Sequence, residues 1–221
     1  MKNLIIIPAR KNSKRIKHKN LINILNKPLI FWTIRYAKKL DKNKFDIVVT
    51  SDCDRIKEIC KKEKIFFLNR PKKLSGDFTS MHDVIFHAFK TLRTSYKYII
   101  LLQPTSPLRE SNLVKSSIKI LEKKKFFDSL IHLGKDNSFT GKVINNRWIP
   151  DYNLVTRTQD IKNKFTPTGN IFVYRSHLYK NRVKLPKKIF GLISSNDKWV
   201  DLDTYQDLQL LKLYAKTLKK I

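Results

Sequence analysis

Short apolar runs alternate with amphipathic segments along the first 122 residues of the chain. The runs hold four or five consecutive apolar residues, which is typical of strands buried on both faces, and the segments between them place apolar residues three and four positions apart, which predicts helices. The four predicted pairs of strand and helix are Leu4–Pro8 with Leu29–Lys39, Asp46–Thr50 with Asp54–Lys62, Ile65–Leu68 with Ser80–Thr91, and Tyr98–Leu102 with Glu110–Glu122. This alternation predicts an α/β fold with a mostly parallel sheet, in which the binding crevice lies at the carboxyl ends of the strands.

The alternation is lost from about Gly134 to Lys164. A stretch of this length without clear periodicity is seldom an inert loop, so we expect a β-rich arm or a subunit-contact insertion within one domain that spans residues 1–221. Beyond it the pattern predicts strands over Ile171–Tyr174 and Val200–Leu202 and a final helix over Thr204–Leu218. Thr204 and Asp207, three residues later, have the spacing of a capping box at the start of that helix.

The composition is that of a globular protein. Hydrophobic residues make up 41% of the chain and aromatic residues 11%, and no apolar stretch approaches the ~18 residues that a membrane span requires. Cys53 and Cys60 cannot build a disulfide framework, and the apolar run that stops at Pro8 is too short for a secretory signal. We therefore expect a cytoplasmic protein without a membrane partner.

The charge is strongly positive, because 47 Lys and Arg residues against 18 Asp and Glu give a formal net charge of +29. Most of the excess is lysine, spread along the whole chain without a basic tail or an Arg-rich tract. Charges spaced about 19 Å apart on such a surface are largely screened at physiological salt, where the Debye length is about 8 Å. The charge therefore favours solvated lysine faces and no nucleic-acid partner, and nucleic-acid binding remains as a third hypothesis for the function.

The densest cluster of basic residues follows the first predicted strand. More than half of the positions from Arg10 to Asn20 are Lys or Arg, at a place where a parallel sheet opens its crevice. Fixed positive charge there suits a triphosphate, because it stabilises the charge that builds on a leaving pyrophosphate. The spacing is neither that of a P-loop nor that of a dinucleotide fingerprint, and a solvated basic loop is the alternative.

Two further features lie at predicted strand ends. In the segment Leu101–Arg109 two prolines bracket small hydroxyl residues and keep Gln103 at the end of a strand; the alternative is a rigid turn with Arg109 as a surface charge. Asp201 and Asp203 stand two positions apart, which places both carboxylates on one face of an extended strand and suits a hard cation. The alternative for that pair is helix capping by Asp203 alone.

Several motifs follow one another from residue 5 to about residue 208. In their order and spacing they resemble the motifs of the acylneuraminate cytidylyltransferase (CMP-sialic acid synthetase) family. The motifs are Ile7-Pro8-Ala9-Arg10-x-Asn12-Ser13-Lys14, Lys19-Asn20, Lys27-Pro28-Leu29, Thr50-Ser51-Asp52, Arg70-Pro71-x-x-Leu74-x-x-Asp77-x-x-Ser80, Leu102-Gln103-Pro104-Thr105-Ser106-Pro107-Leu108-Arg109, Arg157-x-Gln159-Asp160, Gly169-Asn170-Ile171-Phe172 and Asp201-Leu202-Asp203-Thr204. The resemblance implies a three-layer α/β/α fold like that of the nucleotide-diphospho-sugar transferases, a dimerisation insertion and a homodimer. It also implies Mg²⁺-dependent transfer of a cytidylyl group from CTP to the anomeric hydroxyl of an acidic 2-keto sugar.

The resemblance also implies roles for individual residues. The nucleotide would be bound by Arg10, Asn12, Ser13, Lys14, Lys19, Asn20, Arg70 and Ser80, with Arg70 and Ser80 nearest the cytosine. Gln103 and Arg157 would bind the sugar, the arginine through a carboxylate. Asp201 and Asp203 would hold Mg²⁺. Arg10, Lys19 and Asp203 would be the catalytic residues.

The chain departs from the family pattern at two places. Lys11-Asn12 replaces a frequent Gly-Gly, and Thr166-Pro167-Thr168-Gly169 replaces Arg-Pro-Asn-Gly before the late strand. An arginine and an asparagine expected near the sugar are thus missing. We therefore expect a related nonulosonic acid, such as legionaminic or pseudaminic acid, as the acceptor. The second hypothesis is another sugar nucleotidyltransferase of the same fold, for example one for a 3-deoxy-octulosonate-type acid.

Overall fold

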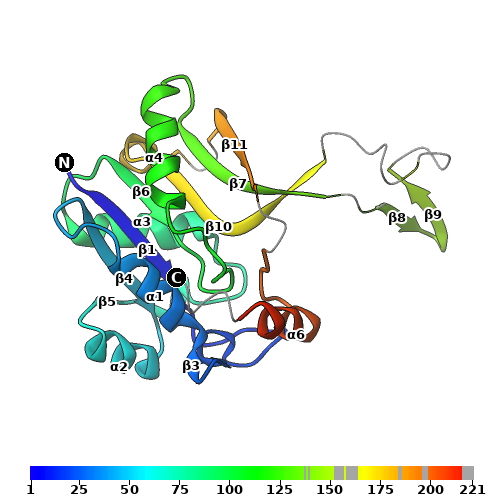
Figure 1. Ribbon diagram of the computed structural model, residues 1–221, viewed down its shortest axis with the longest axis horizontal. Coiled ribbons are helices and arrows are strands. Elements are labelled where there is room, and N and C mark those ends of the chain that lie inside the picture. Colours follow the sequence, from blue (N-terminus) through cyan, green and yellow to red (C-terminus); the bar gives the residue numbers. More distant parts are fainter. Residues whose placement is uncertain are drawn as a thin grey trace.

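The protein is built on one seven-stranded, mostly parallel sheet (Figure 1). The structure, a computed structural model, describes residues 1–136, 138, 140–151, 157, 164–183, 186–195 and 199–215. The order of the strands across the sheet is β11-β7-β10-β6-β1-β4-β5. Their bounds are β1 Asn3–Pro8, β4 Phe45–Ser51, β5 Phe66–Asn69, β6 Tyr98–Leu101, β7 Ser129–Lys135, β10 Phe165–Arg175 and β11 Ile189–Ile193. Only β10 runs antiparallel to its neighbours β6 and β7.

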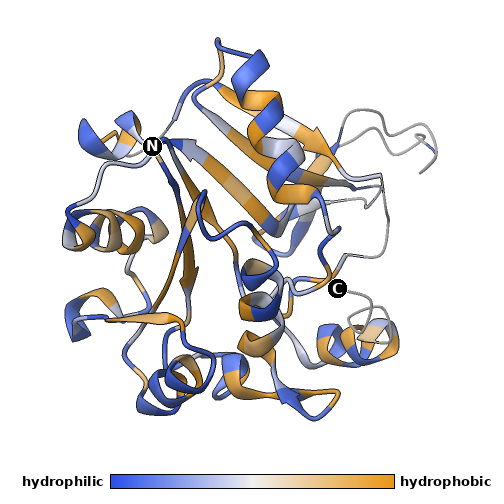
Figure 2. Ribbon diagram, turned by 60° about the vertical axis from the view of Figure 1, so that its left-hand side comes forward, coloured by the Kyte–Doolittle hydropathy of each residue, from blue (hydrophilic) through white to orange (hydrophobic). Residues whose placement is uncertain are grey.

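Helices cover both faces of the sheet, which confirms the predicted three-layer α/β/α architecture. Side chains of β1 alternate between the faces, with Ile5 and Ile7 in one cluster and Leu4 and Ile6 in another. The first cluster contains apolar residues of α1 (Leu29–Lys38), α2 (Asp54–Lys62) and α4 (Leu113–Lys123). The second contains residues of α3 (Met81–Leu92) and α5 (His177–Lys180). In Figure 2 the strands are orange along most of their length, whereas the helices alternate between orange and blue.

The predicted strands and helices of the first half lie within three residues of their observed bounds. The second half differs more, because no strand was predicted over β7 or β11, both of which belong to the sheet. The strand predicted over Ile171–Tyr174 is the end of the longer β10, and Val200–Leu202 is not a strand. Val200 and Leu202 are nevertheless buried, with their apolar side chains in a third hydrophobic cluster, and Leu202 N donates to Thr105 O over 2.9 Å. Buried apolar residues on either side of a polar one, as in Val200-Asp201-Leu202, have the alternating pattern of a strand even where no strand partner is present, which explains the wrong prediction.

The C-terminal helix α6 (Tyr205–Tyr214) packs against elements from the first part of the chain. The predicted capping box is confirmed: Thr204 accepts from Asp207 N, and the Asp207 carboxylate accepts from Thr204 N. The third cluster packs α6 and residues 200–202 against α1 and the loop after β1, which includes the short helix η1 (Lys19–Leu21) and the strands β2 (Asn23–Ile24) and β3 (Lys27–Pro28). The part of the predicted helix beyond Ala215 lies outside the described residues.

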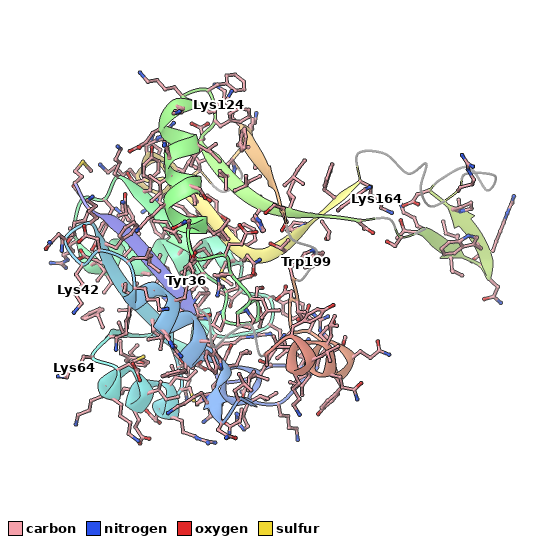
Figure 3. The ribbon with its side chains drawn as sticks, viewed as in Figure 1. Tyr36, Lys42, Lys64, Lys124, Lys164 and Trp199 are labelled. Carbon is pink, nitrogen blue, oxygen red and sulfur yellow. The ribbon has the colours of Figure 1, made fainter. Side chains whose placement is uncertain are left out.

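A hairpin of β8 (Gly141–Ile144) and β9 (Arg147–Pro150) extends away from the sheet beyond the end of β7 (Figure 1). Its turn residues Asn145 and Asn146 have φ values of 49° and 61°, a combination that asparagine tolerates and that two-residue hairpins favour. At the base of this extension Trp199 packs on β7 at Gly134, where an added Cβ would overlap the indole ring (Figure 3). No described helix is both long and apolar enough to cross a membrane.

Candidate active site

A pocket of about 450 Å³ opens at the carboxyl ends of β1, β5 and β6, where the sequence predicted the binding crevice. Its lining combines cations, acids and small polar groups. The lining residues with predicted roles are Arg10, Ser13, Lys14, Lys19, Asn20, Arg70, Gln103, Asp201 and Asp203. The structure therefore gathers nine of the twelve residues predicted for the site, from loops that are up to 193 positions apart in the chain.

The first wall of the pocket is the loop that follows β1. The Asn20 side chain donates to Arg10 O over 3.1 Å and closes this loop on itself. Arg10 Nη1 donates to Asp77 Oδ1 over 2.8 Å, and Lys14 Nζ lies 3.2 Å from Asp77 Oδ2. These hydrogen bonds from Lys14 and Arg10 lower the pKa of the Asp77 carboxyl, although desolvation opposes them. Two cations of the loop thus share one carboxylate.

The second wall is the segment that precedes α6. Lys19 Nζ donates to Asp203 Oδ1 over 2.6 Å and to Leu202 O over 2.7 Å, while Arg15 lies 3.0 Å from Asp203 Oδ2. Lys19 is the most enclosed of the pocket's ion-paired cations, with 12% of its side chain exposed. These contacts tie the second wall to the first. Asp203 pairs with cations, and the cap of α6 is Thr204, which contradicts the alternative of helix capping by Asp203.

Asp201 faces the same pocket from this second wall. Its Oδ1 atom accepts a hydrogen bond of 3.0 Å from the hydroxyl of Ser106, in the turn after β6. Asp201 and Asp203 are the candidate metal ligands, and the described residues hold no group of three or more His, Cys, Asp or Glu side chains that could form a metal site alone. Two carboxylates fit Mg²⁺, which commonly takes one or two protein carboxylates and completes its shell with substrate phosphates and water.

Gln103 lines the pocket near Asp201, and the space around its side chain depends on Gly169. Gly169 has a φ of +72°, and a Cβ there would overlap Ser106 Oγ and lie 2.8 Å from Gln103 Oε1 and 3.2 Å from the Asp201 carboxyl carbon. Only a residue without a side chain lets β10 approach this group so closely. The glycine of the Gly169-Asn170 motif therefore allows the Gln103 and Asp201 side chains to lie next to each other.

Arg109 is buried beneath this group, with 3% of its surface exposed, which excludes the alternative in which it is a surface charge. Its Nε donates to Asn170 O over 2.7 Å, its Nη1 donates to Thr33 Oγ1 over 2.9 Å, and its Nη2 donates to Gln103 O. Burial lowers the pKa of Arg109 to about 10, so the guanidinium remains charged at neutral pH. One side chain thus joins α1, the turn after β6 and β10.

Arg70 occupies the far side of the pocket, at the end of β5. It is buried and donates to Thr50 O over 2.7 Å. Burial lowers its pKa to about 10, with the nearby Asp52 acting in the opposite direction. Its guanidinium is therefore a fixed, charged donor beside the apolar lining residues Leu74, Met81 and Val84. This combination of a polar group and apolar surface suits one edge and one face of a nucleobase.

The remaining three predicted residues lie outside the lining of this pocket. Ser80 caps α3, accepting from Asp83 N over 3.1 Å and donating to its Oδ2 over 2.7 Å, and it lines a neighbouring cavity. Asn12 is exposed on the loop that follows β1, and Arg157 is exposed between residues that are not described. Their predicted roles in binding remain predictions.

The two threonines that depart from the family pattern are oriented differently. Thr168 is fully buried, and its hydroxyl lies 2.8 Å from His132 Nδ1 and 3.3 Å from His132 O. Burial lowers the pKa of His132, so the imidazole is neutral at pH 7, with Glu110 opposing this effect. Thr166 is half-buried and pairs with Gly134 in the β10–β7 ladder. Neither threonine lines the pocket.

Sequence reasoning assigned no role to Asp77, Ser106 or Gly169, which contact pocket residues in the structure. All three lie inside the quoted motifs. Asp77 could have been singled out because acids are rare in this basic chain. The contacts of Ser106 and Gly169 join the turn after β6 to residue 201 and to β10, and no local pattern specifies such a pairing.

The sequence of the chain matches those of known proteins. Residues 4–219 match the model of the cytidylyltransferase family. The chain is 30% identical to the pseudaminic acid cytidylyltransferase of Campylobacter jejuni (strain 81-176), over 98% of this chain and 97% of that protein. It is 28% identical to the N-acylneuraminate cytidylyltransferase of Escherichia coli (strain RS218), over 94% of this chain, and spans 50% of that protein's length.

A solved structure shares the fold. The CMP:2-keto-3-deoxy-manno-octonic acid synthetase complexed with CTP superposes with a TM-score of 0.72 at 17% sequence identity, covering 98% of this chain and 99% of that one. The family match covers nearly the whole chain, and the chain therefore belongs to the cytidylyltransferase family of nucleotidyltransferases.

Proposed function

We propose that the protein transfers the cytidylyl group of CTP to the anomeric hydroxyl of a nonulosonic sugar acid and releases pyrophosphate. The observation that carries this proposal is the convergence of Arg10, Lys14, Arg15 and Lys19 on one pocket whose opposite wall holds two carboxylates. Four cations match the charge of a triphosphate. The family membership and the relatives' names support the same reaction.

In the proposed reaction the sugar hydroxyl oxygen attacks the α-phosphorus, the bond from that phosphorus to the pyrophosphate oxygen breaks, and the hydroxyl proton passes to solvent water. The cations of the loop after β1 orient the triphosphate and stabilise the negative charge that grows on the departing pyrophosphate. Arg70 and the apolar residues beside it hold the base. Gln103, in the lining of the same pocket, presents its side-chain amide to the incoming sugar.

We propose Mg²⁺ as the cofactor, held by Asp201 and Asp203. When bound there, it would neutralise phosphate charge and favour ionisation of the attacking hydroxyl. Ser106 fixes one oxygen of Asp201, and Lys19 and Arg15 fix the two oxygens of Asp203. These contacts orient both carboxylates before any ion arrives, which reduces the conformational cost of metal binding.

For the acceptor we propose legionaminic or pseudaminic acid rather than N-acetylneuraminic acid. The family arginine and asparagine are replaced by Thr166 and Thr168, and the Thr168 hydroxyl is already used by His132. Neither threonine can therefore take over the contacts of a long polar side chain in the pocket. Arg157 remains the proposed partner of the sugar carboxylate.

The test is release of pyrophosphate by the purified protein with Mg²⁺ and each of the four ribonucleoside triphosphates. Each nucleotide is offered with N-acetylneuraminic, legionaminic, pseudaminic and 3-deoxy-octulosonic acids. We expect release with CTP only, with legionaminic or pseudaminic acid, and none after Mg²⁺ is removed by EDTA.

Other outcomes contradict separate parts of the proposal. A preference for N-acetylneuraminic acid would refute the acceptor, turnover of 3-deoxy-octulosonic acid would favour the second hypothesis, and full activity in EDTA would refute the cofactor. If folded protein released no pyrophosphate with any pair but bound DNA or RNA with a steep salt dependence, nucleic-acid binding would replace the proposed function.

We propose a homodimer in which the β8–β9 hairpin contacts the partner. Four of its eight strand residues are large apolar side chains that are at least 44% exposed, namely Val143, Ile144, Trp148 and Ile149. An isolated two-stranded hairpin has little stability in water, so a covering partner would stabilise it. We expect the mass of a dimer in light scattering at micromolar concentration and a shift toward monomer in the double variant Trp148→Ser, Ile149→Ser. A monomeric parent protein would contradict the proposal.

A further inference from the structure

The loop of residues 75–79, between the short helix η2 (Lys72–Leu74) and α3, supplies an anion to the candidate site. Gly76, Asp77, Phe78 and Thr79 all line the pocket. The Asp77 carboxylate bridges two cations of the opposite loop, at 2.8 Å from Arg10 Nη1 and 3.2 Å from Lys14 Nζ. The chain itself therefore places a carboxylate where cations suited to a phosphate converge.

The ion pairs between Asp77 and the two cations are only weakly held. The side chains of Arg10, Asp77 and Lys14 are 32%, 38% and 66% exposed, and exposed ion pairs contribute little to stability. Phe78 is 99% exposed, with Lys14 Nζ 5.5 Å from the centre of its ring, and a Cβ at Gly76 would have no neighbour closer than 3.8 Å. The loop therefore has few packed contacts that would oppose its displacement.

The other bridging carboxylate of the pocket is held more firmly. Asp203 also pairs with two cations, but Lys19 is 12% exposed and is additionally bound to Leu202 O. The residues on either side of Asp203 are fixed by the buried side chain of Leu202 and by the capping box of α6. Of the two carboxylates, only Asp77 lies on a loop that can move away without disturbing the core.

We propose that Asp77 is an internal competitor for the phosphates of the nucleotide: it neutralises Arg10 and Lys14 in the free site, yields them when CTP enters, and returns to them as pyrophosphate leaves. This inference rests on the proposed function, because it requires the cations to bind phosphate groups. A carboxylate and a phosphate repel each other at such short separations, so exchange is favoured over sharing. Asp77 therefore weakens nucleotide binding and assists release of the product.

The test measures binding rather than turnover, with inorganic pyrophosphate and CTP as probes in isothermal titration calorimetry. We expect Asp77→Asn to bind both probes about three- to tenfold more tightly than the parent protein, because two exposed ion pairs no longer compete. Asp77→Glu keeps the competing carboxylate, so its dissociation constants are expected to stay within about twofold of the parent values.

Glu122→Gln is the matched control for net charge. It removes one negative charge and breaks an exposed ion pair of 2.6 Å with Lys97, and Glu122 does not line the pocket. Its affinities are expected to equal those of the parent. Equal tightening in Glu122→Gln and Asp77→Asn would overturn the proposal, since net charge would then explain the effect.

The remaining outcomes separate the inference from the function on which it rests. If the parent binds both probes and Asp77→Asn binds them equally or more weakly, the competitor role is refuted and the proposed function stands. If folded parent and variant proteins both fail to bind pyrophosphate and CTP, the proposed function and the competitor role are refuted together.

Discussion

Lys19→Ala is expected to lower kcat/KM for CTP by about 100- to 1,000-fold, the range found when a single preorganised group that stabilises transition-state charge is removed. Lys19 is the pocket's least exposed ion-paired cation, and its ammonium is fixed by Asp203 and Leu202 O. A cation held in this way needs no reorganisation when charge develops on the phosphates. Its loss should therefore affect the transition state more than the bound substrate, and kcat should fall more than KM rises.

Lys17→Ala is the matched control, because Lys17 is an exposed lysine of the same loop that does not line the pocket. It makes the same change in charge and side-chain length, and its turnover is expected to stay within about twofold of the parent. Steady-state release of pyrophosphate and urea unfolding of both variants provide the comparison. Unchanged turnover in Lys19→Ala would show that this residue has no catalytic role. If instead the loss of turnover equalled the loss of folded protein, Lys19 would only hold the two walls together.

Arg109→Met should lower the free energy of unfolding by about 3 kcal/mol, because it leaves buried acceptors on three elements without their donor. Asn170 O, Gln103 O and Thr33 Oγ1 all accept from this guanidinium. Methionine fills a similar volume, so the loss reports mainly on these hydrogen bonds. The expected shift is measured as a lower denaturation midpoint in urea with an unchanged slope.

Arg55→Met on the exposed side of α2 controls for the loss of a charged arginine and should change stability by less than about 0.5 kcal/mol. An Arg109→Met protein as stable as the parent would show that the three acceptors find other donors. At permissive temperature the variant should also bind the sugar acid more weakly than the parent, because the turn that carries Gln103 and the β10 segment that carries Gly169 lose their common anchor.

The sequence was sufficient for the parts of the fold where burial is continuous. β1, β4 and β6 are apolar on both faces, and the helices beside them have one apolar face, so their bounds could be predicted closely. The direction of β10 could not, because a short apolar run is equally compatible with a parallel or an antiparallel neighbour. Its first half also carries a register shift between Pro167 and Phe172, which no periodicity indicates.

The site was predictable where its residues follow strand ends and unpredictable where it depends on long-range pairs. Arg10 and Gln103 closely follow the ends of predicted strands, Lys19 lies in the same loop as Arg10, and all three line the pocket as expected. The burial of Arg109 depends on acceptors 61 and 76 positions away, and the contact of Asp77 with Arg10 spans 67 positions. A single sequence shows that these residues are charged, but it contains no signal for their partners.

The contact between Lys19 and Asp203 also affects the order in which parts of the structure form during folding. These two residues are 184 positions apart, whereas neighbouring strands such as β1 and β4 or β4 and β5 pair over much shorter separations. The entropy of closing a long loop must be lost before a contact of high sequence separation contributes to stability, so such contacts tend to form late. We therefore expect the two walls of the pocket to come together after the sheet that carries the loop of the first wall, so the proposed metal site is among the last parts of the fold to be completed.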